Sequence, residues 1–133
     1  MIVTPLYAGI LTLIFVFLSF RVIRGRYAAR AALGDGGDRR LLRHQRAHAN
    51  FAEYVPLALI LMALIELQSG PGWVLHAMGM ALLVGRPVHA YGVSQEPETL
   101  RFRQIGMVLT FTALTVGAAA NLWLALAKYA TAA

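Results

Sequence analysis

The stretch RAHANFAEYVP, residues 46–56, places ion-binding groups at the start of an apolar run that continues as LALILMALI. It contains a guanidinium (Arg46), an amide (Asn50), a carboxylate (Glu53) and a phenol (Tyr54). On an α-helix these four residues share one face, because they follow one another by four, three and one positions. Guanidinium groups bind carboxylates in a planar fork, and a carboxylate suits an ammonium group. The pattern therefore predicts a site for an anion that also carries one cationic group.

A second polar cluster, in the segment GRPVHAYG, contributes Arg86 and His89. The turn near Gly70 makes the two flanking segments an antiparallel hairpin. Glu53 lies 17 residues before Gly70 and Arg86 lies 16 residues after it, so the two should reach the same depth. By the same counting Asn50 lies level with His89. One hairpin thus brings both clusters into one layer.

This layer holds more cations than anions. Arg46, Arg86 and either Arg101 or Arg103, at the start of the last apolar segment, stand against the single carboxylate of Glu53. A structural ion pair between Glu53 and Arg86 is the simpler interpretation. Buried cations without a partner are unfavourable, however, so the excess favours an anionic ligand over a purely structural pair.

The composition indicates a membrane protein. Of 133 residues, 59% are apolar and 14% charged, which is too few charges to cover a soluble domain of this size. The net charge of +6 does not indicate a nucleic-acid binder, because such proteins are not this apolar. Cysteine is absent, and the four histidines do not share a face, so we expect no disulfide and no metal site.

Four apolar segments predict an all-α, integral membrane four-helix bundle formed by one domain, residues 1–133. The arginine-rich link after the first segment and the loop before Arg101 fall on the same side, which by the positive-inside rule is the cytoplasm. Both termini are then outside, and the polar layer lies on the cytoplasmic side. Gly106 and Gly117, each followed by a polar residue four positions later, favour close helix packing. The predicted spans are approximately 2–22, 46–67, 73–93 and 103–127.

RAHANFAEYVP resembles the signature of the membrane-associated proteins in eicosanoid and glutathione metabolism (MAPEG), in which Arg is followed four positions later by Asn and then, after three more, by Glu. GRPVHAYG is similar to the third-helix segment of that family, and the long basic first loop and short outer turn also match. The resemblance implies a homotrimer of four-helix protomers, with glutathione bound as cofactor between neighbours at the cytoplasmic face. It also implies a bacterial-type member, located in the inner membrane.

Carried over by position, the resemblance implies specific residue roles. The family's catalytic Arg follows the third span, where Arg101 and Arg103 both qualify. An Arg near the thiol of glutathione lowers its pKa from about 8.5, and the thiolate can attack a lipophilic electrophile. The implied glutathione contacts are Arg46, His48, Asn50, Glu53, Tyr54, Arg86, His89 and Tyr91, with Arg21, Arg24 and Arg26 at the rim.

The leading hypothesis is therefore a microsomal-type glutathione transferase or peroxidase that acts on lipophilic substrates. The alternative is a non-enzymatic MAPEG-like protein that binds lipid or a partner. A small multidrug transporter ranks third, because a transporter needs polar access from both sides and only Glu66 and His76 lie near the other face. Glutathione binding followed by a conjugation assay separates the first two hypotheses.

Overall fold

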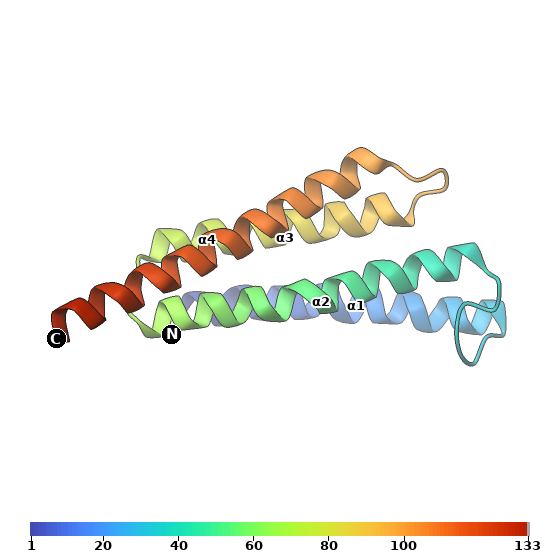
Figure 1. Cartoon of the computed structure of the whole chain (residues 1–133). Helices are drawn as coiled ribbons and strands as arrows, with labels where there is room; N and C mark the ends of the chain where they lie inside the picture. The colour runs from blue at the N-terminus through green and yellow to red at the C-terminus, as the bar shows by residue number, and fades with distance from the viewer. Residues whose placement is uncertain (133) are drawn as a thin grey trace.

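Four α-helices make up almost the whole chain (Figure 1). The computed structural model describes residues 1–132, and these contain no strand. The predicted all-α, four-helix fold is thus confirmed. Each helix contains, to within one residue, one of the four predicted spans, while the limits of the spans in a membrane remain a prediction. The helices are α1 (Val3–Ala29), α2 (Arg39–Leu67), α3 (Gly72–Ser94) and α4 (Leu100–Ala132).

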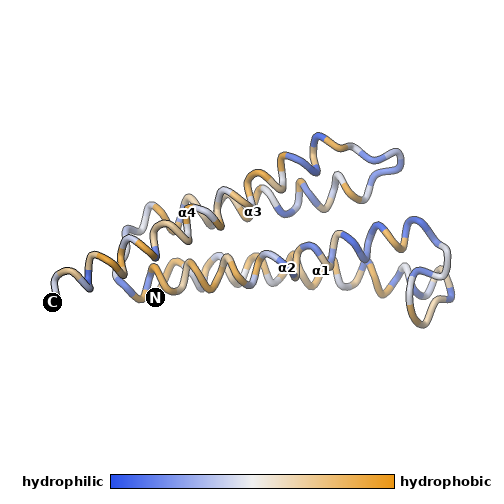
Figure 2. Tube along the Cα trace, in the orientation of Figure 1, coloured by the Kyte–Doolittle hydropathy of each residue, from blue (hydrophilic) through white to orange (hydrophobic). Residues whose placement is uncertain are grey.

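The four helices run antiparallel, so that their connections alternate between two ends. Figure 1 shows α1 beside α2 and α3 beside α4, with both termini and the 68–71 turn at one end. The links 30–38 and 95–99 lie together at the opposite end, which we call the loop end. In Figure 2 most of the hydrophilic residues gather at the loop end, and the middle of the bundle is mainly apolar. The arginine residues that flank both links, at the ends of α1, α2 and α4, therefore share one end of the bundle, as predicted.

The central pair of the bundle is α2 and α3. Each of them contacts the other and both outer helices, whereas α1 and α4 do not contact each other within residues 1–132. The core between the helices is apolar and closely packed. The largest fully buried apolar side chains are Leu11, Leu41, Met62, Ile65, Leu75, Met78 and Leu82.

The helix α3 differs from the other three. By length and composition α1, α2 and α4 can each cross a membrane, but α3 is interrupted by His76, Arg86 and His89 and does not meet that criterion. Instead, 11 of its 23 residues are buried, including Arg86 and His89. Other helices, rather than lipid, therefore cover the two polar side chains near its loop end. Large apolar side chains such as Phe17, Phe20 and Trp123 are exposed on the outer helices, as suits a bilayer.

Glycines allow α4 to approach α3 closely. A Cβ atom on Gly106 would lie 2.5 Å from the carbonyl oxygen of Gly85 and 2.5 Å from the Cβ of His89. One on Gly117 would lie 2.5 Å from the Cε of Met78. At Gly106 the backbone of α3 leaves no room for a side chain, and at Gly117 the flexible end of Met78 would have to move, so the close packing that the sequence predicted at both positions is present. Gly106 in addition fixes the place of His89.

The link between α1 and α2 positions the helix that carries RAHANFAEYVP. Gly34, Gly36 and Gly37 have φ angles of 66°, 59° and 78°, in the left-handed region that side chains disfavour. Asp38 then begins α2, since its Oδ1 accepts a hydrogen bond from the Leu41 N–H at 2.9 Å. The segment GDGGD thus forms a tight turn that reverses the chain, and its last residue, Asp38, caps α2.

Glu66 has a structural place at the other end of the bundle. Its carboxylate accepts hydrogen bonds from the backbone N–H groups of Ile2, of Val3 at 2.8 Å and of Thr4 at 2.8 Å. The first N–H groups of a helix have no partner within the helix, and α1 has no side-chain cap of its own. Glu66 therefore satisfies the start of α1, which accounts for this carboxylate without a transport role.

Candidate functional site

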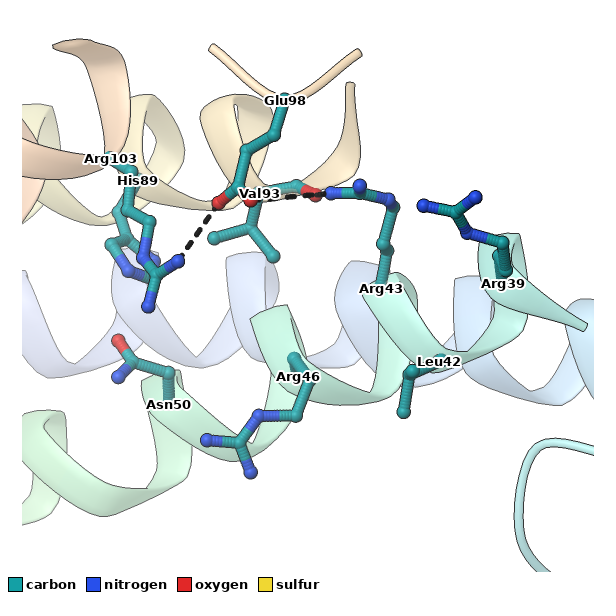
Figure 3. A pocket seen from close by; sticks show the side chains of 9 residues that line it. All are labelled: Arg39, Leu42, Arg43, Arg46, Asn50, His89, Val93, Glu98 and Arg103. Atoms are coloured by element: carbon teal, nitrogen blue, oxygen red, sulfur yellow. Dashed lines mark hydrogen bonds and ion pairs between the residues drawn. The ribbon is translucent and has the colours of Figure 1, made fainter. Parts of the chain in front are cut away.

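A pocket of about 250 Å³ opens at the loop end, between the start of α2, the end of α3 and the start of α4. Figure 3 shows the side chains that point toward it from the three helices and from the 95–99 loop. Its residues come from two segments, 39–50 and 89–103, that are 39 positions apart at their nearest members, so only the fold brings them together. The lining residues are Arg39, Leu42, Arg43, Arg46, Asn50, His89, Val93, Glu98 and Arg103.

The pocket is strongly basic, because four guanidinium groups face one carboxylate. Glu98 lies between two of them: its Oε1 is 2.9 Å from Nη1 of Arg103, and its Oε2 is 3.6 Å from Nη1 of Arg43. Arg43 also donates a hydrogen bond of 3.1 Å to the backbone carbonyl of Val93. Arg46 is exposed and has no ion pair or side-chain hydrogen bond within the described residues. An anion can therefore reach Arg46 directly and compete with Glu98 for Arg103.

Below the pocket, Arg86 is held inside the bundle with only 1% of its surface exposed. Its Nη2 donates to Oδ1 of Asn50 at 2.5 Å, and its Nη1 donates to Oγ1 of Thr110 at 3.1 Å. The rings of Phe51 and Tyr54 lie 5.8 and 6.0 Å from its Cζ. A buried guanidinium needs such partners, and here neutral groups of α2 and α4 supply them. Arg86 is thus part of the floor that fixes Asn50.

The predicted pairing of Glu53 with Arg86 is wrong. Glu53 is exposed, and none of the three ion pairs found among residues 1–132 includes it. The depth of Arg86 along the bundle was predicted correctly to within one turn, since Arg86 contacts Asn50 and Tyr54, which both lie within one helical turn of Glu53. The direction of the Glu53 side chain was predicted incorrectly, because Asn50 lies beside Arg86 and Glu53 points away from the bundle.

The predicted single face of RAHANFAEYVP is therefore divided. Asn50 and Tyr54 point into the bundle, where the Tyr54 ring packs edge-on against Phe111 with centroids 5.5 Å apart. Arg46 and Glu53 are both exposed, seven positions apart, which is two turns and about 10 Å along the helix. Asn50 and Tyr54 therefore pack within the bundle, whereas Arg46 and Glu53 are available to a ligand or to a second protein molecule.

The structure separates His48 from the pocket, in agreement with its predicted place off the main stripe. Its Nε2 lies 3.1 Å from Oγ of Ser19, and its ring stacks on Phe15 with centroids 4.6 Å apart. Both partners belong to α1, so within one chain His48 joins α1 to α2. His48 can therefore contact the same ligand as Arg46 only if the two residues come from different copies of the chain.

The remaining predicted residues differ in position. His89 lines the pocket, is 3% exposed, and its Nδ1 is buried without a hydrogen-bond partner. Tyr91 is exposed and packs on Phe102, away from the pocket lining. Of the two catalytic candidates, Arg103 lines the pocket, whereas Arg101 is exposed outside it. Of the two, Arg103 is therefore the one that lines the pocket of the single chain.

Sequence reasoning missed the acidic side of the site. Glu98 bridges Arg43 and Arg103, and Glu96 pairs with Arg39, whose Nε lies 3.3 Å from its Oε1. Both carboxylates belong to SQEPE, residues 94–98, a segment whose composition by itself indicates only a break between helices. The available signal was their rarity, because the whole chain has only six acidic residues. Within residues 1–132, no group of three metal-ligating side chains is placed to hold a metal ion.

Comparison with known proteins identifies the family. The model of the MAPEG family matches residues 4–123, which is most of the chain. The chain belongs to the MAPEG family. Among curated MAPEG relatives, the inner membrane protein YecN of Escherichia coli K12 is 40% identical over 121 residues, which cover 91% of each chain. YecN of Escherichia coli O6:H1 (strain CFT073) matches equally well. No solved structure matches the chain.

Family membership and the apolar helices make the chain an integral membrane protein of the MAPEG family. The residues on which the resemblance depended occupy the expected end of the bundle. Arg46, Asn50, His89 and Arg103 line one pocket, and Glu53 lies beside it on the exposed side of α2.

Proposed function

We propose that this MAPEG protein binds glutathione at the loop-end pocket and acts as a glutathione transferase or peroxidase on lipophilic electrophiles. The observation that carries the proposal is the pocket's charge. Arg39, Arg43, Arg46 and Arg103 surround a cavity with one carboxylate, Glu98, at the end of an apolar bundle. Such a site attracts a water-soluble anion to a place that lipophilic molecules reach through the bilayer.

The residues present fit glutathione, which offers two carboxylates, one ammonium and one thiol. The unpaired fork of Arg46 suits a carboxylate, and Arg43 lies one turn away to receive another. The exposed carboxylate of Glu53 suits the ammonium. His89 Nδ1, buried without a partner, offers one further polar contact at the inner wall.

The pocket of one chain is too small to enclose the whole ligand. Its volume of about 250 Å³ falls below the ~300–1,000 Å³ usual for drug-sized ligands. Arg46 and Glu53 are also exposed, and a bare carboxylate beside lipid is unfavourable. These observations support a site completed by a neighbouring copy, and by the family resemblance we propose a homotrimer. His48 of one protomer can then approach Arg46 of the next.

Arg103 is the residue that we assign to the chemistry. Glutathione supplies a thiol, which reacts with electrophiles as the thiolate. A guanidinium beside that sulfur favours the charged form and lowers the thiol pKa. Glu98, 2.9 Å from Arg103, competes for the same guanidinium and holds it in place before a ligand arrives. Asn50 and the lining of α3 then orient the ligand.

The site's location follows from the arginine distribution. By analogy with YecN, which is named an inner membrane protein, we place this chain in a bacterial inner membrane. The loop end would then face the cytoplasm, where glutathione is plentiful in the cells that make it, and both termini would be outside.

The matched pair Arg103→Gln and Arg101→Gln tests the assignment, because both remove one positive charge from the start of α4. The thiolate absorbance of bound glutathione, titrated against pH, reports the thiol pKa. We expect Arg103→Gln to raise this pKa and lower the rate of conjugation to a generic electrophile, while Arg101→Gln leaves both unchanged. Glu98→Gln should lower the pKa by freeing Arg103. Equal effects of the two arginine variants would contradict the assignment.

A second candidate function is a MAPEG protein that binds a ligand without catalysis. It is favoured by Asn50, whose carbonyl oxygen is already engaged by Arg86, and by Tyr91, which lies outside the pocket lining. Glutathione binding without turnover of any electrophile or peroxide would support this candidate over the transferase.

A further inference from the structure

A second basic cavity lies on the other side of α2, between the last turns of α1 and the first turns of α2. Its volume is about 350 Å³, and it shares no lining residue with the loop-end pocket. Three guanidinium groups, one imidazole and one carboxylate line it: Arg21, Arg24, Arg40, His44 and Asp38.

The cations of this cavity lack partners. Among the residues that the structure describes, Arg21, Arg24 and Arg40 make no ion pair and no side-chain hydrogen bond. The carboxylate of Asp38 is occupied in part, since its Oδ1 caps α2 through the Leu41 N–H at 2.9 Å. Three positive groups against one carboxylate leave an excess of two positive charges, which repel one another unless an anion joins them.

Two further features indicate a formed site rather than a charged surface. The Nδ1 atom of His44 is buried and has no hydrogen-bond partner. Buried polar atoms are normally satisfied, and His44 lines the same cavity as three arginines, so an oxygen atom of a bound anion would satisfy a proton on this nitrogen. Gly25 lines the cavity and lets α1 lie close to α2, because a Cβ there would lie 2.9 Å from Cδ1 of Leu41.

The cavity lies where the apolar surface of α1 ends. Phe17, Phe20 and Ile23, on the preceding turns, are 62%, 58% and 46% exposed, as expected of side chains in contact with acyl chains. Arg21 and Arg24 follow immediately on the same helix. Phosphate groups of lipids occupy this depth of a bilayer, and clusters of basic side chains there recognise anionic headgroups.

We propose that this α1–α2 cavity binds a phosphate group, and that its source is the headgroup of an anionic phospholipid in the leaflet at the loop end. The forks of Arg21 and Arg40 bind phosphate oxygens by paired hydrogen bonds, His44 donates one more, and Arg24 closes the outer side. The acyl chains extend along Phe17 and Phe20. In the single chain this site is separate from the loop-end pocket, and the role proposed here for Arg21 and Arg24 replaces the rim role that the resemblance implies for them.

The test uses the full-length protein in an uncharged detergent. Native mass spectrometry counts retained phosphatidylglycerol against phosphatidylcholine, and thermal unfolding with added inorganic phosphate examines a soluble source. The variants are Arg21→Gln/Arg40→Gln and, because Arg24 is exposed and its replacement should not disturb folding, Arg24→Gln. Arg30→Gln is the matched control, since it removes a charge from an exposed residue outside this cavity.

We expect the wild type to retain more phosphatidylglycerol than phosphatidylcholine. The double variant should bind phosphatidylglycerol at least roughly tenfold more weakly, because it lacks hydrogen bonds to a charged group. Arg24→Gln should show a smaller loss and Arg30→Gln none. Stabilisation of the wild type alone by inorganic phosphate, without lipid preference, would support the phosphate site and assign it to a soluble ligand. Equal lipid and phosphate binding by the wild type, Arg24→Gln and Arg30→Gln would overturn the proposal.

Discussion

The buried Arg86 gives the most quantitative test of how the bundle supports its site. Thr110→Val keeps the shape of the side chain but removes the hydroxyl that accepts from Arg86 Nη1 at 3.1 Å. Among residues 1–132, the one other acceptor of that nitrogen is the Sδ of Met107 at 4.0 Å, which is weak. A hydrogen bond to a charged group contributes about 1.5–3 kcal/mol in soluble proteins, whereas bonds between membrane helices average about 0.6 and reach about 1.7.

We expect Thr110→Val to lie near the top of the membrane range, at about 1.5 kcal/mol, because Arg86 is 1% exposed and its freed nitrogen cannot reach water. Reversible unfolding of the detergent-solubilised protein by sodium dodecyl sulfate, followed by circular dichroism, measures the change. Thr115→Val is the matched control on the exposed face of the same helix and should change the free energy of unfolding by less than about 0.5 kcal/mol. Equal effects of the two variants would refute the role given to the Arg86 network.

Three further predictions concern packing, capping and topology. Gly106→Ala should lower the free energy of unfolding by about 1–3 kcal/mol, because the added methyl group has no room beside Gly85. Gly9→Ala is the control, since it adds a methyl group in open space and should be neutral or slightly stabilising. The same unfolding assay measures both. Glu66→Ala should speed hydrogen exchange of the Val3 and Thr4 amides without altering the loop end, and unchanged exchange would contradict the cap. A cysteine at Asp35 should react with a membrane-impermeant reagent only from the cytoplasmic side, and one at Gly72 only from outside.

The position of each residue along the bundle could be predicted from the sequence. Helical rise is constant, so counting from the turn near Gly70 placed Arg86 level with Glu53 and His89 level with Asn50. In the structure Arg86 donates to Asn50, one turn before Glu53, and His89 lines the same pocket as Asn50, so the predicted layer is present to within one turn. The one-sided distribution of arginine likewise predicted that the arginines flanking the 30–38 and 95–99 links share one end of the bundle. Both inferences need only the length of each helix.

The rotation of each helix could not be predicted in the same way. Asn50 and Glu53 are close on the helical surface, and which of them meets Arg86 depends on where α3 and α4 pack around α2. The structure places Asn50 inward and Glu53 outward, so the predicted ion pair became a hydrogen bond to an amide. Glu98 was missed for a related reason, since a loop residue acquires its partners only when the ends of α2 and α4 come together.

The most direct test of the account is the affinity for glutathione of the wild type and of Glu53→Gln, measured by isothermal titration in mild detergent. We expect the wild type to bind glutathione saturably. Gln keeps the shape of Glu but cannot form an ion pair with an ammonium group, so Glu53→Gln should weaken the binding free energy by about 1.5–3 kcal/mol, or the affinity roughly ten- to a hundredfold. Glu96→Gln, which removes a loop-end carboxylate outside the pocket, should bind as the wild type does. Absence of glutathione binding by the wild type, or equal affinity in Glu53→Gln with the oligomer intact, would contradict the account.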